Sequence, residues 1–252
     1  MAFAHADDDI VLPRGRLYFA HFNPGTRTPQ ASRLYIGNTP GFSLTADSST
    51  LDHYTADSSV RIKDRSVVTE VNYKATLQSD NISEANLARF FMGTSAAVAQ
   101  TAATGVTESF TGLVADAVIQ LGVTATNPTG ARNVSSVTIT GKVLGTDYEL
   151  DAARGQIHVV TAGAYAVTYS VAAVSRQQVR SAGQQVAGAL TFISDNPVGT
   201  NRDVYMPYVL LTPNGEFSMK GDGQAWASMS FNLQVMQKDA NSPALYLDGQ
   251  AA

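Results

Sequence analysis

The histidines of this sequence, its best candidates for metal ligation and proton transfer, are few and lie far apart. No two histidines have the spacing of a metal site, and the chain has no cysteine to complete one. The four histidines are His5, His21, His53 and His158. His5 precedes the acidic run Asp7–Asp9, which could bind a divalent ion, but a solvated terminus explains the same cluster. We therefore expect no metal site.

Sequence signatures of nucleophilic and phosphate-binding enzymes are also missing. Gly41–Thr45 reads Gly-Phe-Ser-Leu-Thr and lacks the final glycine of a hydrolase nucleophile elbow. Gly221–Gly223 is typical of a hairpin turn, and no glycine-rich loop precedes a helix pattern. Carboxylate pairs that only the fold brings together stay open as an alternative. We predict that the protein is not an enzyme and uses no cofactor.

Two further patterns have simple structural explanations. Asn81–Ser83 and Asn133–Ser135 match the acceptor pattern for N-glycosylation, but no secretory signal accompanies them. Ser83 also suits the N-cap of a helix. Trp226 and the tyrosines could stack on sugars or peptides, although such residues in strands more often belong to a core or an interface.

The composition favours a mainly β protein. The 24 valines, 24 threonines and 8 isoleucines among 252 residues have branched β-carbons, which suit a pleated sheet. Hydrophobic residues make up 44% and charged residues 15%, so a sizeable core is available and the surface must rely on uncharged polar side chains. The length allows one large domain or two small ones.

The charge balance and the N-terminus argue against several functions. The 17 basic and 21 acidic residues give a formal charge of -4, which leaves no basic excess to grip a phosphate backbone. The lack of cysteine fits a reducing cytoplasm. The sequence MAFAHADDDI is acidic where a secretory signal is basic, and no window approaches about 18 uninterrupted apolar residues. We expect neither secretion by that route nor a membrane span.

Alternation of apolar and polar residues predicts the strands of the N-terminal part. The first strand is Arg16–Phe22, and the second is Leu34–Ile36, which resumes at Phe42–Thr45. The third is the long strand Ser66–Asp80, which has one apolar and one polar face. Between them, Ala46–Lys63 is rich in aspartate and serine, and we interpret it as a long functional loop.

One short helix follows the long strand. Ser83 is its expected N-cap and Gly93 its C-cap, while Leu87, Phe90 and Phe91 form its apolar stripe.

A separate β module is predicted in the middle of the chain. Its strands are Val118–Thr126, Ser136–Lys142, Gln156–Val160 and Ala164–Val171. We divide the chain into a core at 1–112, an inserted β-sandwich-like or hairpin module at 113–172, and the rest of the core at 173–252. A tandem of two domains is the alternative layout. In the last part, strands are expected at Gly188–Ser194, Val204–Leu211, Glu216–Met219 and Ala225–Met236.

Three stretches, in order, resemble a known family. They are PRGRLYFAHFNPGT (Pro13–Thr26), RLYIGNTPGFSLT (Arg33–Thr45) and TLDHYTADSSVRIKDRSV (Thr50–Val67). They resemble the N-terminal half of the tail tube proteins, or major tail proteins, of long flexible-tailed, siphovirus-type bacteriophages. With the long strand, the helix and the C-terminal hairpin, the resemblance covers most of residues 10–95 and 185–247. GTDYELDAARGQI (Gly145–Ile157) is similar to a β module that some of these proteins carry.

The resemblance implies a tail-tube-type β-barrel or β-sandwich with one short flanking helix and an inserted β module. Six copies would form a ring, and stacked rings would form the hollow tube of a non-contractile tail, through which DNA passes without specific binding. The expected partners are other copies of the chain, a tape measure protein inside the tube, and tail-tip and tail-terminator proteins at its ends. The expected location is the virion tail, assembled in the cytoplasm of the bacterial host.

The tube hypothesis assigns roles to two sets of residues. The candidates for contact between rings are Leu51, Asp52, Tyr54, Asp57, Val60, Arg61, Ile62 and Lys63. The candidates for facing the lumen are Glu70, Asn72, Thr76, Gln78 and Asp80. The alternative for the first set is a loop folded on its own subunit. The inserted module would decorate the tube or reinforce contacts between rings.

A different functional class stays open beside the tube hypothesis. The chain could be a β-rich virion decoration or host-surface-binding module that does not polymerise. Self-association discriminates between the two, because only a tube subunit forms rings or long tubes when concentrated.

Overall fold

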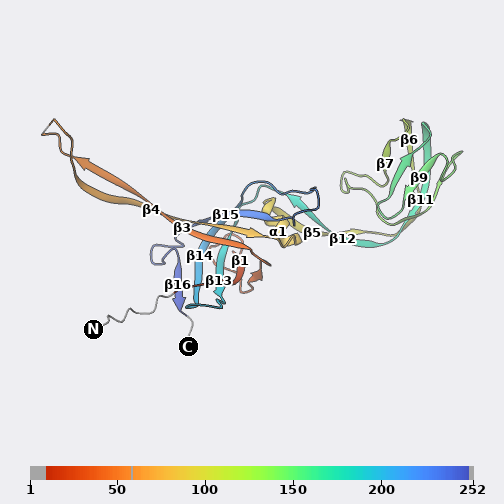
Figure 1. Ribbon diagram of the computed structural model, residues 1–252. Helices are drawn as coiled ribbons and strands as arrows, with labels where there is room; N and C mark the ends of the chain where they lie inside the picture. Colours follow the sequence, from red (N-terminus) through yellow and green to blue (C-terminus); the bar gives the residue numbers. More distant parts are fainter. Residues whose placement is uncertain (1–9, 58, 250–252) are drawn as a thin grey trace. The chain divides into compact units, whose positions relative to one another are not determined.

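The chain is mainly β, as its composition predicts (Figure 1). The computed structural model describes residues 10–57 and 59–249. Contacts divide the chain into one compact unit made of Met1–Ser95 with Val179–Ala252, and a second made of Ala96–Gln178. The module expected at 113–172 lies inside the second unit, which begins earlier and ends later. No helix among the described residues is long and apolar enough to cross a membrane.

The first unit is built on one eight-stranded sheet. Its strands are β1 (Gly15–His21), β2 (Leu34–Tyr35), β3 (Gly41–Tyr54), β4 (Lys63–Ser79), β13 (Val186–Ser194), β14 (Arg202–Pro213), β15 (Met229–Val235) and β16 (Tyr246–Gly249). The order is β2-β1-β13-β14-β15-β4-β3, with β16 also paired to β14, and the pairs are antiparallel. Because β2 and β3 end the order without pairing to each other, the described part of one chain forms an open sheet and no closed barrel.

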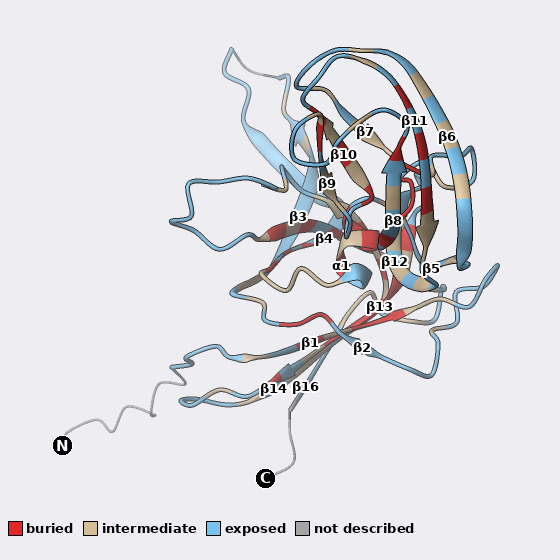
Figure 2. Cartoon of the chain, turned by 90° about the vertical axis from the view of Figure 1, so that its right-hand side faces the viewer, coloured by how far each residue is buried: buried red, intermediate tan, exposed pale blue. Residues whose placement is uncertain are grey.

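One face of this sheet carries the core of the first unit. Alternate residues of β4 and β15 point into it, so Leu77, Phe231 and Leu233 are each 1% exposed. The helix α1 (Glu84–Phe90) lies on this face, where the ring of Phe90 meets that of Phe231 edge-on at 5.8 Å between centroids. Figure 2 shows the buried residues in red along β1 and β14.

The interpretation of Ala46–Lys63 as a loop is wrong for Ala46–Tyr54 and for Lys63, which lie in β3 and β4. β3 continues to Tyr54, and the register with β4 runs from the pair Gly41 and Gln78 to the pair Tyr54 and Lys63. The pattern hid this strand because both of its faces are exposed there, and backbone pairing needs no apolar side chains.

The expected strand Glu216–Met219 is also absent, and β15 begins at Met229 rather than at Ala225. The ring of Phe217 packs instead against Phe90 of the helix, at 5.9 Å between centroids. The residues between β14 and β15 therefore form a long loop.

The start of the helix is as predicted, but its end is not. Asn86 N donates a hydrogen bond to the Ser83 hydroxyl at 3.3 Å, which confirms the N-cap. The C-cap is Phe91, and Met92, not Gly93, adopts the left-handed conformation with φ of 49°. Gly93 starts the next strand, where a β-carbon would fall 1.9 Å from the carbonyl oxygen of Arg180. Glycine is required there for close backbone approach.

The second unit contains two three-stranded sheets. Its strands are β6 (Ala103–Leu113), β7 (Val118–Gln120), β8 (Val134–Ile139), β9 (Tyr148–Asp151), β10 (Gln156–Val159) and β11 (Gly163–Val171). The orders are β7-β10-β9 and β6-β11-β8. A two-stranded sheet of β5 (Gly93–Gln100) and β12 (Val174–Ser181) contains the two points where the chain passes between the units. We did not expect β5, β6, β9 and β12, of which β5 and β6 are rich in alanine, threonine and serine and show little contrast between faces.

Two buried tyrosines organise the core of the second unit. Tyr165 donates its hydroxyl hydrogen to the carbonyl oxygens of Asp147 at 2.7 Å or Thr161 at 2.8 Å. Tyr169 donates to the Glu108 carboxylate, and burial, with this contact, raises the pKa of Tyr169. The polar ends of both rings are therefore satisfied inside the core.

A buried asparagine joins the helix to the sheet in the first unit. Asn86 is 1% exposed, and its side-chain amide donates to the carbonyl oxygens of Ile36 at 2.7 Å and Asn81 at 2.8 Å. Its own oxygen accepts from Arg89 at 2.5 Å. One side chain thus makes hydrogen bonds to polar groups of three residues, Ile36, Asn81 and Arg89.

Replacing this asparagine should destabilise the first unit. Asn86→Ala removes a donor to the Asn81 carbonyl oxygen and the buried acceptor of Arg89, while the Ile36 carbonyl oxygen still accepts from the Asn81 amide at 3.2 Å. We expect a loss of about 2–4 kcal/mol in the free energy of unfolding, measured by urea denaturation. Ala85→Ser, at an exposed position of the same helix, is the control and should change it by less than about 0.5 kcal/mol. Equal effects of the two substitutions would contradict this assignment.

A partly buried histidine should make stability depend on pH. Burial, together with the charge of Arg89, lowers the pKa of His21 below its ordinary value of 6.5. Below about pH 6.5 the unfolded chain therefore binds a proton more readily than the folded chain, and stability falls with falling pH. The urea midpoint should decrease between pH 7.5 and pH 5.5, and His21→Gln should flatten this part of the curve. Parallel curves for the two proteins would exclude His21 as the cause.

Candidate assembly surfaces

The polar face of the large sheet contains most of the expected lumen residues. Asn72, Thr76 and Gln78 share one side of β4, opposite the core residues Ala75 and Leu77. Glu70 is exposed on the same strand and accepts a hydrogen bond from Asn72 at 2.6 Å. Asp80 differs, because it follows the end of β4 and accepts from Asn38 at 2.5 Å.

Pairing between strands extends this polar face beyond β4. Thr76 lies between Ser43 of β3 and Asn232 of β15. The hydroxyl oxygens of Thr76 and Ser43 are 2.6 Å apart. Gln78 donates to the Ser228 hydroxyl at 3.1 Å. The sequence alone could not identify the residues that the register adds. They are Ser43, Thr45, Ser230, Asn232, Gln234 and Thr212.

Charge is sparse on this face. Lys74 of β4 forms an ion pair with Asp47 of β3 at 3.0 Å. Apart from the Glu70 carboxylate, the other residues of this face offer hydroxyl and amide groups, which hydrogen-bond to one another and to water. Such a surface has no excess of positive charge with which to hold phosphate groups.

The second surface is an arm, defined as residues 47–72, made of the distal parts of β3 and β4 and the turn between them. The arm is the orange ribbon at the left of Figure 1 and is pale blue in Figure 2. The described residues of its two strands pair with each other and with no other strand. An isolated two-stranded ribbon is marginally stable in water, so the arm is a surface that can gain stability from a partner.

The apolar side of β4 continues from the core into the arm without being covered there. Leu77 and Ala75 are 1% and 2% exposed, whereas Val71, on the same side, is 51% exposed. Val67, beyond a bulge in the pairing, is 62% exposed and lies opposite Leu51. Leu51, Val60 and Ile62, three of the expected ring-contact residues, are also mostly exposed.

The polar ring-contact candidates are largely engaged within the arm itself. Asp52 pairs with Lys63 at 2.8 Å and accepts from Ser66 at 2.6 Å, and these hydrogen bonds lower the pKa of Asp52. The guanidinium of Arg61 lies 5.0 Å from the centre of the Tyr54 ring. Asp57 is exposed in the turn. These contacts engage the polar side chains of the arm with one another and leave its apolar side chains as the main exposed feature.

A third exposed surface is the loop between β14 and β15. Trp226 is 94% exposed and Met219 is 84% exposed, so Trp226 belongs neither to a strand nor to the core. Phe217 anchors the loop to the helix. The sequence pattern missed this loop because its residues alternate like those of a strand.

The histidines and acidic residues are the candidates for metal ligation in the sequence. In the part of the chain that the structure describes, no group of three histidine or acidic side chains could hold a metal ion. His53 contacts Asp64 at 2.6 Å in the arm, and His158 lies 3.3 Å from Glu149 and 3.7 Å from Asp116 in the second unit. His5 and Asp7–Asp9 lie outside the described residues.

Comparison with family models gives one match, which spans residues 11–244. The chain belongs to the family described as protein of unknown function UCP028589. The matched residues include the arm, the polar face and the whole second unit. No curated protein matches the sequence.

The part of β4 in the arm and the part in the sheet, Tyr73–Ser79, should differ in local stability. We expect the amides of Lys63–Asn72 to exchange with deuterium about 100-fold faster, or more, than those of Tyr73–Ser79, because the distal ribbon lacks a covering layer. Hydrogen exchange of the dilute chain, followed by mass spectrometry, measures both segments of one strand. Equal protection along β4 would mean that the arm is covered in the monomer.

Proposed function

We propose that this chain is the tube subunit of a long, non-contractile bacteriophage tail. In this role six copies form a ring, and stacked rings form a hollow tube that conducts DNA at ejection. The sequence resemblance at Pro13–Thr26, Arg33–Thr45 and Thr50–Val67 suggests this function. The structural observation that supports it best is the arm, which extends the apolar side of β4 beyond the core that covers it.

An uncovered apolar ribbon is what a polymerising subunit needs. Burying apolar surface stabilises a contact by about 25 cal/mol per Å2, so exposed valine, leucine and isoleucine side chains favour association. The arm also exposes unpaired backbone edges, which ordinary monomers avoid and which strands of neighbouring copies can use. We therefore assign contact between copies to the arm.

The polar face suits the wall of a DNA conduit. Its hydroxyl and amide groups offer few positive charges to phosphate, and the chain as a whole has a formal charge of -4. DNA could then slide along the wall without sticking to it. We assign Asn72, Thr76 and Gln78, with Ser43 and Asn232 beside them, to the lumen.

The same proposal includes the partners and the location that the resemblance implies. A tape measure protein would occupy the lumen during assembly, and tail-tip and tail-terminator proteins would cap the two ends. The second unit, which interrupts the first in the sequence, would decorate the tube or reinforce its rings.

Tube formation should depend on the apolar side chains of the arm. In the variant Leu51→Ser, Ile62→Ser, Val67→Ser, positions that are 69%, 61% and 62% exposed, the monomer should fold normally but form no tubes. The readout is negative-stain electron microscopy of the concentrated chain, with circular dichroism to confirm folding. The matched control is Val114→Ser, Val143→Ser, Leu144→Ser in the second unit, where exposure is 66%, 61% and 58%.

A shortened arm gives a second test of the same surface. Residues 47–72 can be replaced by Asn-Gly, because Ala46 and Tyr73 are paired in register and Asn-Gly favours a two-residue hairpin turn. This variant should also stay monomeric. Normal tubes from both arm variants would contradict the proposal. A wild-type chain that stays monomeric at every concentration would favour a virion decoration or host-surface-binding module.

A further inference from the structure

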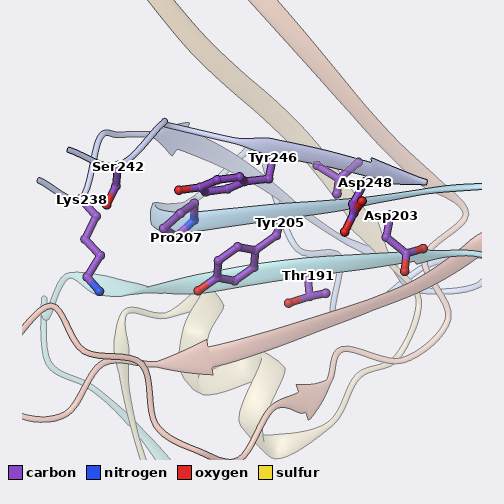
Figure 3. A pocket seen from close by; sticks show the side chains of 9 residues that line it. Thr191, Asp203, Tyr205, Pro207, Lys238, Ser242, Tyr246 and Asp248 are labelled. Carbon is purple, nitrogen blue, oxygen red and sulfur yellow. The ribbon is translucent and has the colours of Figure 1, made fainter. Parts of the chain in front are cut away.

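A groove lies beside β14 and β16 in the first unit (Figure 3). It has a volume of about 430 Å3 and is lined by side chains from β13, β14, β16 and the loop before β16. This volume lies in the range of small-molecule sites. A second hollow of about 280 Å3, lined by Arg33 among others, shares Thr191 and Tyr205 with it. Neither the arm nor the polar face contributes to the groove.

Two tyrosines form an aromatic platform in the groove. Tyr205 and Tyr246 are directly paired across β14 and β16, and their ring centroids are 6.1 Å apart with 31° between the planes. They remain 38% and 41% exposed, so ring surface is available to a ligand. Aromatic faces carry partial negative charge and attract the C–H groups of a ring laid against them.

Two carboxylates lie on the same side of the same ladder. Asp203 is directly opposite Asp248, two residues along each strand from the tyrosine pair. The pair places two carboxylates side by side at one end of the groove. Asp203 already accepts a hydrogen bond from Ser194 N at 2.8 Å, while carboxylates can accept several hydrogen bonds at once.

Hydrogen-bond donors lie at the other end of the groove. Lys238 and Ser242 line that end, and the hydroxyl groups of Tyr205 and Tyr246 point toward it in Figure 3. Thr191 lies near the platform, and its hydroxyl accepts from Arg33 at 3.4 Å. The groove therefore has acceptors at one end, donors at the other and aromatic rings between.

We infer that this groove binds a saccharide. A sugar ring presents C–H groups to an aromatic platform and hydroxyl groups that can donate to Asp203 and Asp248 and accept from Lys238. The opposed carboxylates disfavour phosphates and other anions and suit a neutral or amino sugar. The adjoining hollow at Arg33 gives room for a second sugar unit. This inference goes beyond tube formation and does not depend on it.

Binding can be measured on the full chain at concentrations below those that produce assembly. The probes are N-acetylglucosamine, glucosamine, galactose and N,N′-diacetylchitobiose, each titrated up to about 10 mM while 1H–15N spectra are recorded. We expect saturable shifts for at least one sugar, centred on Thr191, Tyr205 and Tyr246. An acidic and a basic hexapeptide are titrated in parallel. Stronger binding of a peptide than of every sugar would overturn the inference.

Three substitutions and one control separate the platform from the charges. Tyr205→Ala and Asp248→Asn should each weaken sugar binding by about tenfold, whereas Tyr205→Phe, which keeps the ring, should retain it within about threefold. Tyr54→Ala removes a tyrosine of similar exposure, 40%, from the arm and should have no effect. Asp248→Asn keeps the side-chain volume, so its effect is informative even if Tyr205→Ala fails to fold. Binding by none of the sugars, or unchanged binding by Tyr205→Ala and Asp248→Asn, would overturn the inference while leaving tube formation untouched.

Discussion

The β3–β4 ladder is the interaction on which the first unit and its surfaces depend. The antiparallel pairing runs from Gly41 with Gln78 to Tyr54 with Lys63, with register shifts at Ser49/Thr50 and His53/Tyr54. At its base the ladder joins the sheet through β15 and helps to cover the core. Farther out it has no covering layer, yet it persists because backbone hydrogen bonds between strands do not require buried side chains. One pairing therefore builds both the polar face and the arm.

The two sides of this ladder have different physical consequences. On one side, hydroxyl and amide groups of four strands form a surface with few charges, which are the paired Lys74 and Asp47 and the carboxylate of Glu70. On the other side, burial ends abruptly between Ala75 and Val71. Exposed apolar surface of this kind is unfavourable in water and becomes favourable when a partner covers it. In the proposed tube, the polar side would face the lumen and the apolar side would contact neighbouring copies.

Several features of the first unit depend on specific side-chain contacts between segments rather than on alternation. The Asn86 amide donates hydrogen bonds to the carbonyl oxygens of Ile36 and of Asn81, which precedes the helix. Phe217, in the loop between β14 and β15, packs against the helix. Opposed pairs on β14 and β16 create the groove, with two tyrosines beside two aspartates. Each of these features joins segments that are far apart in the sequence.

The sequence by itself determined the mainly β class, the alternation of β4 and β15, and the N-cap at Ser83, because these follow from residue type and local period. It placed Asn72, Thr76 and Gln78 on one side of a strand for the same reason. Only the tertiary structure decided that Ala46–Lys63 is mostly strand, that Trp226 is exposed, and that Asp203 faces Asp248. Those outcomes depend on register and on which surfaces a neighbouring segment covers, and neither is encoded in the local pattern of residues.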